Sequence, residues 1–159
     1  MSRSTRTSTR VARLAAALGS AAILLGVAAP AGLAAPRADA LTVTGVWARA
    51  TASSAKDGAA YFTIKGGSTA DSLTGAKVDM MVAMSATLHK SSMDSGGMMS
   101  MSPVKAVPVP AGKTVAFKPG GFHVMLMGLK ASLKVGATFK LTLVFAKAGA
   151  ESVTVTVRR

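Results

Sequence analysis

Residues that can bind a soft metal ion are concentrated in one part of the sequence. Apart from Met1, all nine methionines lie between residues 80 and 127, and so do both histidines, His89 and His123. Thioether sulfur is a soft donor and imidazole nitrogen a borderline one, and this combination suits copper(I). The sequence has no cysteine, which excludes thiolate metal sites and the blue copper centre of an electron-transfer cupredoxin. The composition therefore indicates a copper site built from thioethers and imidazoles.

Residue spacing brings several of these donors to one side of a β-strand. Side chains two residues apart in a strand share a face. In the segment FHVMLM, this period places His123, Met125 and Met127 on one face. Met99 and Met101 are again two residues apart, beyond a glycine-rich turn. One strand and a neighbouring hairpin are thus expected to supply the ligands together.

Methionine more often fills gaps in a hydrophobic core, and this alternative is favoured for Met80, Met81 and Met84. Met93 and Met98 differ, because they flank a polar turn with two glycines where burial is not expected. Exposed methionine without a function is unusual, so this turn favours a metal-binding role. Additional metal ligands are therefore expected among four residues, namely Met93, Met98, Met99 and Met127.

The elements that must position these donors are β-strands. Short runs alternate apolar and polar residues between glycine and proline turns, without a sustained helical period. Strands are predicted at residues 41–49, 59–65, 73–78, 85–90, 98–104, 114–117, 122–127, 138–145 and 152–157. Turns are predicted at residues 66–67, 96–97, 108–112, 119–121 and 148–150, the last of which closes a hairpin. The pattern predicts a single-domain, all-β sandwich or barrel of the Greek-key kind.

Residues 1–40 have the organisation of a signal peptide. Several arginines precede an apolar run at residues 14–29, which is too short for a confident membrane-spanning helix. The small residues around Asp39 match a signal-peptidase site, and cleavage is predicted after Ala40. A slightly earlier cut and retention as an uncleaved anchor are the alternatives. The mature domain is then residues 41–159, exported to the periplasm or the outside of the cell envelope.

The basic charge of the chain suggests an alternative hypothesis for its function. The net charge is +13, of which residues 1–40 contribute +4, leaving +9 on residues 41–159. The alternative function is therefore a basic exported β-sandwich that binds anionic envelope polymers or a membrane surface, with structural methionines. The lysines recur at intervals of roughly ten residues without forming a run, which weakens this alternative.

Two further function classes are disfavoured. Aromatic residues make up only 4% of the chain, too few for a platform that stacks nucleic-acid bases, so no nucleic-acid partner is expected. No arrangement of histidine, carboxylate and nucleophile is recognisable, so the protein is not expected to be an enzyme.

The order of the donor residues resembles that of exported copper chaperones of the PCuAC type. The family pattern is His, ten residues, Met, 21 residues, His-x-Met. Here 21 residues separate Met101 from His123-Val124-Met125, whereas eleven separate His89 from Met101. The additional residue is assigned to the glycine turn, where a hairpin tip tolerates insertion. Further family landmarks follow in the expected order: Val46-Trp47-Ala48-Arg49-Ala50, Ala59-Ala60-Tyr61-Phe62, Leu88-His89, Met101-Ser102-Pro103-Val104, and residues 118–127 and 141–145.

This resemblance implies a cupredoxin-like β-barrel that binds one copper(I) ion. Carried over residue by residue, the metal ligands are His89, Met101, His123 and Met125. The insertion leaves Met99 as the alternative to Met101. Copper(II) is a further candidate ion, bound through the histidines.

The resemblance also implies a role in copper delivery. The expected recipient is a copper-accepting protein, either the copper-centre subunit of a haem-copper oxidase or a thiol-bearing copper carrier. This function would make the protein an assembly factor for cytochrome c oxidase. A monomer is expected.

Overall fold

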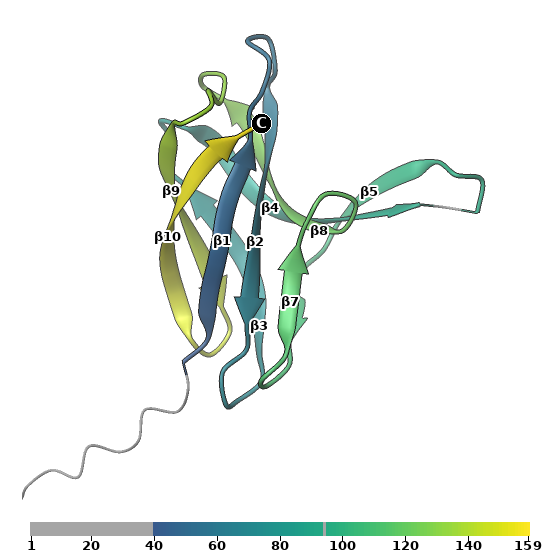
Figure 1. Ribbon diagram of the computed structural model, residues 1–159, viewed down its shortest axis with the longest axis vertical. Helices are drawn as coiled ribbons and strands as arrows, with labels where there is room; N and C mark the ends of the chain where they lie inside the picture. Colours follow the sequence, from purple (N-terminus) through teal and green to yellow (C-terminus); the bar gives the residue numbers. More distant parts are fainter. Residues whose placement is uncertain (1–39, 94) are drawn as a thin grey trace, which may run out of the picture. The chain divides into compact units, whose positions relative to one another are not determined.

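The computed structural model describes residues 40–93 and 95–159, which form ten β-strands (Figure 1). The predicted signal peptide lies outside the described residues, apart from Ala40. None of the described residues belongs to a helix that is long and apolar enough to cross a membrane. The strands are β1 (Thr42–Arg49), β2 (Asp57–Lys65), β3 (Asp71–Val78), β4 (Ala83–Met93), β5 (Met99–Pro103), β6 (Val107–Val109), β7 (Thr114–Phe117), β8 (Phe122–Leu129), β9 (Thr138–Phe145) and β10 (Gly149–Arg158).

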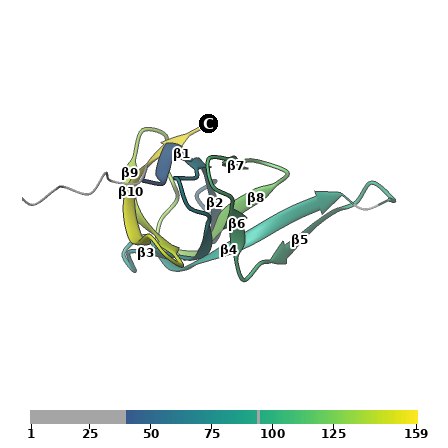
Figure 2. The same cartoon turned by 90° about the horizontal axis from the view of Figure 1, so that it is seen from below.

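The strands form one sheet in the order β5-β4-β8-β7-β2-β1-β10-β9-β3-β6, with β8 also pairing β2. Most neighbours are antiparallel, whereas β1 pairs β10 and β7 pairs β8 in parallel. Figure 2 shows the sheet curving around a common interior, with β5 and the outer end of β4 extending away from it. The prediction of an all-β, cupredoxin-like fold is confirmed.

The core is built from alternate positions on the strands. Phe62 is 1% exposed and stacks on Phe117, with 4.4 Å between the ring centroids. On β8, Val124 and Leu126 are fully buried, so the residues between and beside them face the other way. Other fully buried side chains come from β2, β3, β6, β9 and β10: Ile64, Leu73, Val107, Val109, Leu141, Leu143, Val155 and Val157.

The turn predicted at residues 108–112 was partly wrong, because Val107–Val109 form the strand β6. Asp71 pairs with Val109 and Leu73 with Val107, and both valines are buried. Proline has no N–H to donate to a neighbouring strand, so it is tolerated at a sheet edge. Because β6 ends the strand order, Pro108 has a neighbour on one side only.

The core role favoured for Met80, Met81 and Met84 was wrong, since their side chains are 74%, 83% and 69% exposed. The first two lie in the turn between β3 and β4, where Asp79 Oδ1 accepts the N–H of Met81 at 2.8 Å. This local hydrogen bond holds the turn and leaves its side chains in solvent. Met84 lies over Gly128, where an added Cβ would be 2.8 Å from the methionine sulfur.

Strand β4 is long enough to pair with two neighbouring strands, one along its first part and the other along its last part. Its first part, from Ala83 to Lys90, pairs with β8, and its last part, from His89 to Met93, pairs with β5. The outer part of the β4–β5 hairpin therefore projects beyond the rest of the sheet (Figure 1). This arrangement places His89 where the body of the sheet gives way to the hairpin.

Candidate metal centre

The two histidines face each other across adjacent strands. His89 on β4 is directly opposite His123 on β8, and their ring centroids are 5.9 Å apart. Thr87 is opposite Met125 in the same ladder. Because side chains alternate along a strand, these four residues share one face of the sheet.

Strand β5 adds methionines to the same face. Met101 is opposite Ser91, and Met99 is opposite Met93 at the outer end of the hairpin. Since Ser91 and Met93 follow His89 at intervals of two residues, all of these positions belong to the face of the histidines. A shift of two residues along the ladder, which returns to the same face, is called one pairing step. Met101 lies one pairing step from the level of the two histidines, and Met99 lies two steps from it.

The ring of His123 is held in one orientation by the backbone. It is 4% exposed, and its Nδ1 lies 3.1 Å from the carbonyl oxygen of Gly121. A carbonyl can only accept, so Nδ1 carries the hydrogen and donates it. The lone pair is then on Nε2, as in metal-binding histidines whose other ring nitrogen is anchored by the protein.

Two hydrogen bonds connect His89 to Met127 through the hydroxyl of Thr87. The Thr87 hydroxyl donates to the sulfur of Met127 at 3.8 Å, and His89 Nε2 lies 3.1 Å from the same hydroxyl oxygen. The hydroxyl has only one hydrogen, so when that hydrogen points to the sulfur the oxygen accepts from His89 Nε2–H. This leaves the lone pair on His89 Nδ1. That atom is buried and has no hydrogen-bond partner.

An unpartnered buried nitrogen is unfavourable unless something binds it, because it has lost its hydrogen bonds to water. A metal ion at His89 Nδ1 would supply the missing partner. Burial lowers the pKa of His89 below its usual value, and the nearby His123 imidazole adds to this effect. The ring is therefore neutral at pH 7, which is the form that binds metals.

The stability of the metal-free protein is expected to fall as the pH drops below about 7. The folded-state pKa of His89 is depressed below the unfolded value of 6.5, so the unfolded chain takes up a proton first. This contribution is fully present above the unfolded pKa and is lost as the pH falls towards the folded pKa. Urea unfolding at pH values between 8 and about 5 measures this change in stability, as a shift of the unfolding midpoint.

The control for this pH dependence is His89→Gln, which has no imidazole to titrate. The difference in stability between wild type and variant should shrink as the pH falls. An unchanged difference across this window would contradict the depressed pKa of His89.

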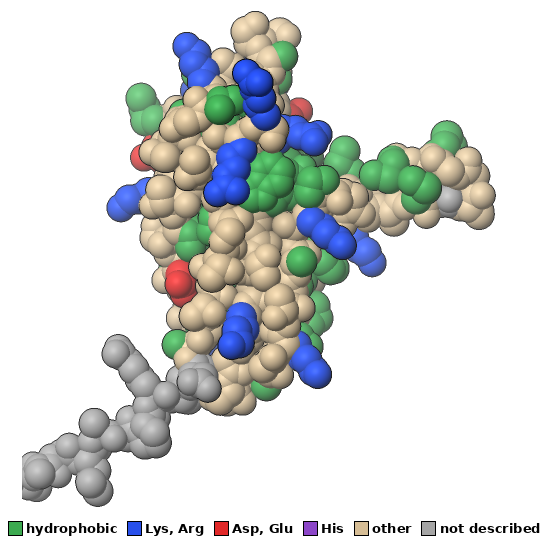
Figure 3. All heavy atoms as spheres, in the orientation of Figure 1, with side chains coloured by type: hydrophobic (Ala, Val, Ile, Leu, Met, Phe, Trp, Pro, Cys, Tyr) green, Lys and Arg blue, Asp and Glu red, His purple; other side chains and the backbone are tan. Residues whose placement is uncertain are grey.

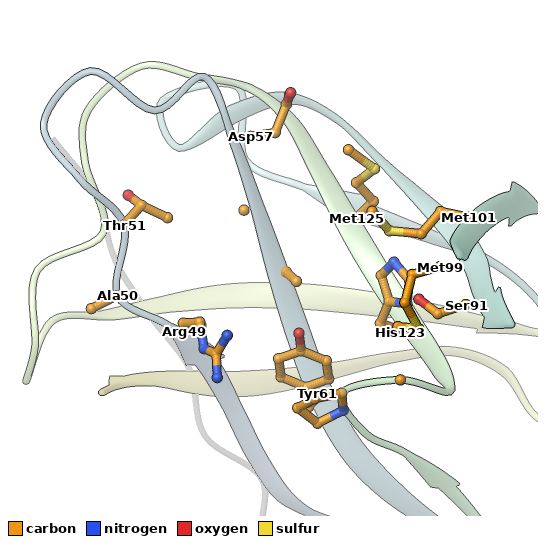
Figure 4. Close-up of a pocket in the computed structure, with 14 residues that line it drawn as sticks. Arg49, Ala50, Thr51, Asp57, Tyr61, Ser91, Met99, Met101, His123 and Met125 are labelled. Carbon is orange, nitrogen blue, oxygen red and sulfur yellow. The ribbon is translucent and has the colours of Figure 1, made fainter. Parts of the chain in front are cut away.

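A pocket of about 440 Å³ opens beside His123. Figure 4 shows His123, Met125, Met101 and Met99 towards one end of it and Arg49 with its neighbours towards the other. Met125 is half-buried and Met101 is 61% exposed, so an ion bound between them would be accessible from solvent. His89 is not among the lining residues.

The predicted donors separate into three groups in the structure. The first group lies on one strand face near the junction of β4, β8 and β5 and consists of His89, His123, Met125 and Met101. Met93 and Met99 pair farther out on the hairpin, and Met98 precedes β5 next to them. Met127 shares the strand face of His123, but its sulfur accepts a hydrogen bond from Thr87.

Sequence reasoning missed the residues that orient the two rings. Thr87 lies two residues before His89 on β4, so the strand period could have identified it, whereas Gly121 precedes β8 and acts through its backbone carbonyl. Tyr61 was also missed as a neighbour: its ring centroid is 6.4 Å from that of His123 and 4.7 Å from that of Trp47. Burial raises the pKa of Tyr61, although Arg49 opposes this, so the phenol stays protonated.

The donor chemistry limits which metals the centre suits. Within residues 40–93 and 95–159, no group of three or more His, Asp and Glu side chains is placed to hold a metal ion. The side chains of Met101 and Met125 lie on the same strand face as the two histidines and offer thioether sulfur there. Thioethers select soft ions such as copper(I) over calcium, magnesium or manganese.

The fold and the arrangement of donors define a domain of the PCuAC type. The apo PCuAC domain from PmoF1 is 30% identical and superposes with a TM-score of 0.62, covering 76% of this chain and 95% of that domain. The copper(I) form of DR1885 from Deinococcus radiodurans is 33% identical with a TM-score of 0.56, covering 80% of this chain and 83% of that one.

The chain belongs to the family described as "Putative lipoprotein LpqE-like", whose model matches residues 41–157. A relative from Leifsonia xyli subsp. xyli (strain CTCB07), "Putative lipoprotein Lxx21020", is 34% identical over 158 residues. The alignment covers 94% of this chain and 93% of the relative. Both descriptions use the word lipoprotein, and the present sequence contains no cysteine.

Proposed function

We propose that this protein is an extracytoplasmic copper chaperone that binds one copper(I) ion through His89, Met101, His123 and Met125. The observation that carries the proposal is the unpartnered, buried Nδ1 of His89, opposite His123 and on the same strand face as two thioethers. Support also comes from DR1885, a structural relative solved with copper(I).

The donor set suits a carrier better than an enzyme or an electron-transfer protein. Two neutral imidazoles and two thioethers satisfy copper(I), and thioether sulfur does not titrate. A cysteine ligand would bind the ion more tightly and would be open to oxidation outside the cell. Because Met101 lies at the exposed edge of the centre, an incoming partner can replace it first during transfer.

The proposed function includes a protein that receives the copper, a second oxidation state of the bound ion and a location outside the cytoplasm. We infer delivery to a copper-accepting protein, either an oxidase copper-centre subunit or a thiol-bearing carrier. Copper(II) binding through the histidines is a second form. The signal peptide of residues 1–40 would export a monomeric domain of residues 41–159, and the family description as a lipoprotein supports a location in the envelope.

A direct titration tests the function. The mature protein is titrated anaerobically with copper(I) against a competing chelator, and the tightly bound ion is counted. One ion per chain is expected in this high-affinity class. A stoichiometry near zero would overturn the proposal.

Of the two candidate methionines, we infer that Met101 is the ligand of the histidine centre. It lies one pairing step from His89, within the diagonal reach of a long side chain, whereas Met99 is one step farther. Met101→Leu is expected to weaken copper(I) binding at this centre by at least about 10-fold, the minimum expected even for the loss of an outer-shell partner. In the same chelator competition, Met99→Leu should leave the affinity of this centre nearly unchanged. The reverse order would show that the insertion has shifted the ligand to Met99.

Charge offers less support for the alternative of binding to anionic polymers. Lysine and arginine side chains are spread over most of the face in Figure 3 and are not gathered in one patch. That function would require salt-sensitive binding to a polyanion that does not depend on copper. A polyanion-binding assay with and without bound copper therefore distinguishes the two functions.

A further inference from the structure

The outer β4–β5 hairpin has two chemically different faces. One face carries Met93, Met99 and Met101, and the residue opposite Met101 is Ser91. The other face pairs Ser92 with Ser100, whose hydroxyl oxygens are 3.3 Å apart. Alternation of this kind normally serves to bury one face of a strand.

The methionines of this face are exposed, whereas Ser91 on the same face is buried. Met93, Met99 and Met101 are 68%, 57% and 61% exposed. Figure 3 shows hydrophobic side chains along the projecting hairpin, away from the body of the domain. Core packing therefore does not account for placing sulfur at each of these positions.

The register brings two of the sulfurs within reach of one ion. Met93 and Met99 are directly opposite each other, and side chains in such pairs start about 4.5–5.5 Å apart. Methionine is unbranched and flexible, so two thioethers at this spacing can close on a single soft ion.

We propose that Met93 and Met99 form a second copper(I) site on the β4–β5 hairpin, weaker than the histidine centre. Its two thioether ligands belong to the hairpin alone, so binding there does not depend on the proposed histidine centre. Two sulfurs without an imidazole should hold the ion more loosely and exchange it faster.

The position of this site relates it to the histidine centre. Met101 lies between the two, one pairing step from each, and a step of two residues along a strand is about 7 Å. The ion can move inward by exchanging one thioether for another, with no change of oxidation state. The Met93–Met99 pair would then act as a loading site for the histidine centre. This loading role rests on the proposed function, whereas copper(I) binding by the pair does not.

The test is a titration of the mature protein labelled with ¹³C at the methionine methyl groups. Silver(I), a soft and redox-inert substitute, and copper(I) under anaerobic conditions are added in separate experiments and followed by ¹H–¹³C NMR. The first equivalent should shift Met101 and Met125. The second should shift Met93 and Met99, with an affinity at least about 10-fold weaker. Failure of the Met93 and Met99 signals to shift by the second equivalent would overturn the proposal.

Matched variants on the exposed hairpin should not disturb the fold. Met93→Leu and Met99→Leu should each remove the second binding event. Met98→Leu, next to the pair in sequence but outside the ladder, and Met84→Leu, exposed elsewhere, should each retain it. Loss of the second event in either control would refute the assignment to the Met93–Met99 pair.

A double variant separates this proposal from the function of the histidine centre. His89→Gln with His123→Asn should abolish the tight site and leave the shifts of Met93 and Met99 intact. Loss of the hairpin shifts in this variant would overturn an independent second site. If wild type lacks tight binding but the hairpin signals still shift, the proposed function fails while the second site stands.

Discussion

Replacing His123 by asparagine is expected to lower the affinity for copper(I) by at least about 100-fold while the domain remains folded. The loss should exceed the 10–100-fold typical of outer-shell partners, because a direct ligand is removed. Asparagine places an amide nitrogen near the position of the ring Nδ1, so the hydrogen bond to the Gly121 carbonyl can persist. The ligating Nε2 has no counterpart in the variant. Chelator competition measures the affinity, and thermal unfolding checks the fold.

A parallel variant on the facing strand tests the proton assignments. His89→Gln retains a donor near the position of Nε2, where it can still bond to the Thr87 hydroxyl, but removes Nδ1. A similar loss of affinity is therefore expected. Thr87→Val, which removes the hydroxyl while nearly preserving shape, should cost only about 10-fold as an outer-shell change. Wild-type affinity in either histidine variant would exclude that imidazole as a ligand.

Phe62→Ala is expected to lower the free energy of unfolding by about 3–5 kcal/mol, the usual cost of removing a buried phenylalanine ring. The ring is fully buried and stacks on Phe117 across the β2–β7 pair. Domains of this size are stable by only about 5–15 kcal/mol, so a large part of the stability is at stake. Urea unfolding followed by circular dichroism measures the change.

The matched control for the core is Thr63→Ala, at the next residue of β2, where the side chain is only partly buried. Its effect should be below about 1 kcal/mol. Strand β2 also pairs with β8 beside Met125, so copper binding by Phe62→Ala should fall with the folded fraction. Equal effects of the two substitutions would contradict the placement of the Phe62 ring in the core.

The sequence was a good guide to the strands because their signal is local. The alternation of apolar and polar residues predicted residues 114–117 and 138–145 with the bounds observed for β7 and β9. It also predicted that His123, Met125 and Met127 share a face, which depends only on the period of an extended chain. The strand β6 was missed because Pro108 reads locally as a turn residue, whereas an edge position makes it acceptable.

Burial was harder to predict from residue type. Methionine is apolar, and a local pattern does not show whether a neighbouring element covers it. Met80 and Met81 are exposed because Asp79 holds their turn, and Met84 is exposed although its side chain lies against Gly128. The exposure of Met80 and Met81 depends on a contact that the residue type does not encode.

By itself, the sequence determined the kind of chemistry. Nine methionines and two histidines in one segment without cysteine limit the candidate centre to thioethers and imidazoles. Only the tertiary structure decided which of these donors lie beside the histidines and which lie farther out on the β4–β5 hairpin. The register of β4 with β8 and β5 places His89 opposite His123, Met101 one step away and Met99 opposite Met93. Register results from pairing between segments distant in the chain, and a shift of one residue would turn every donor to the other face.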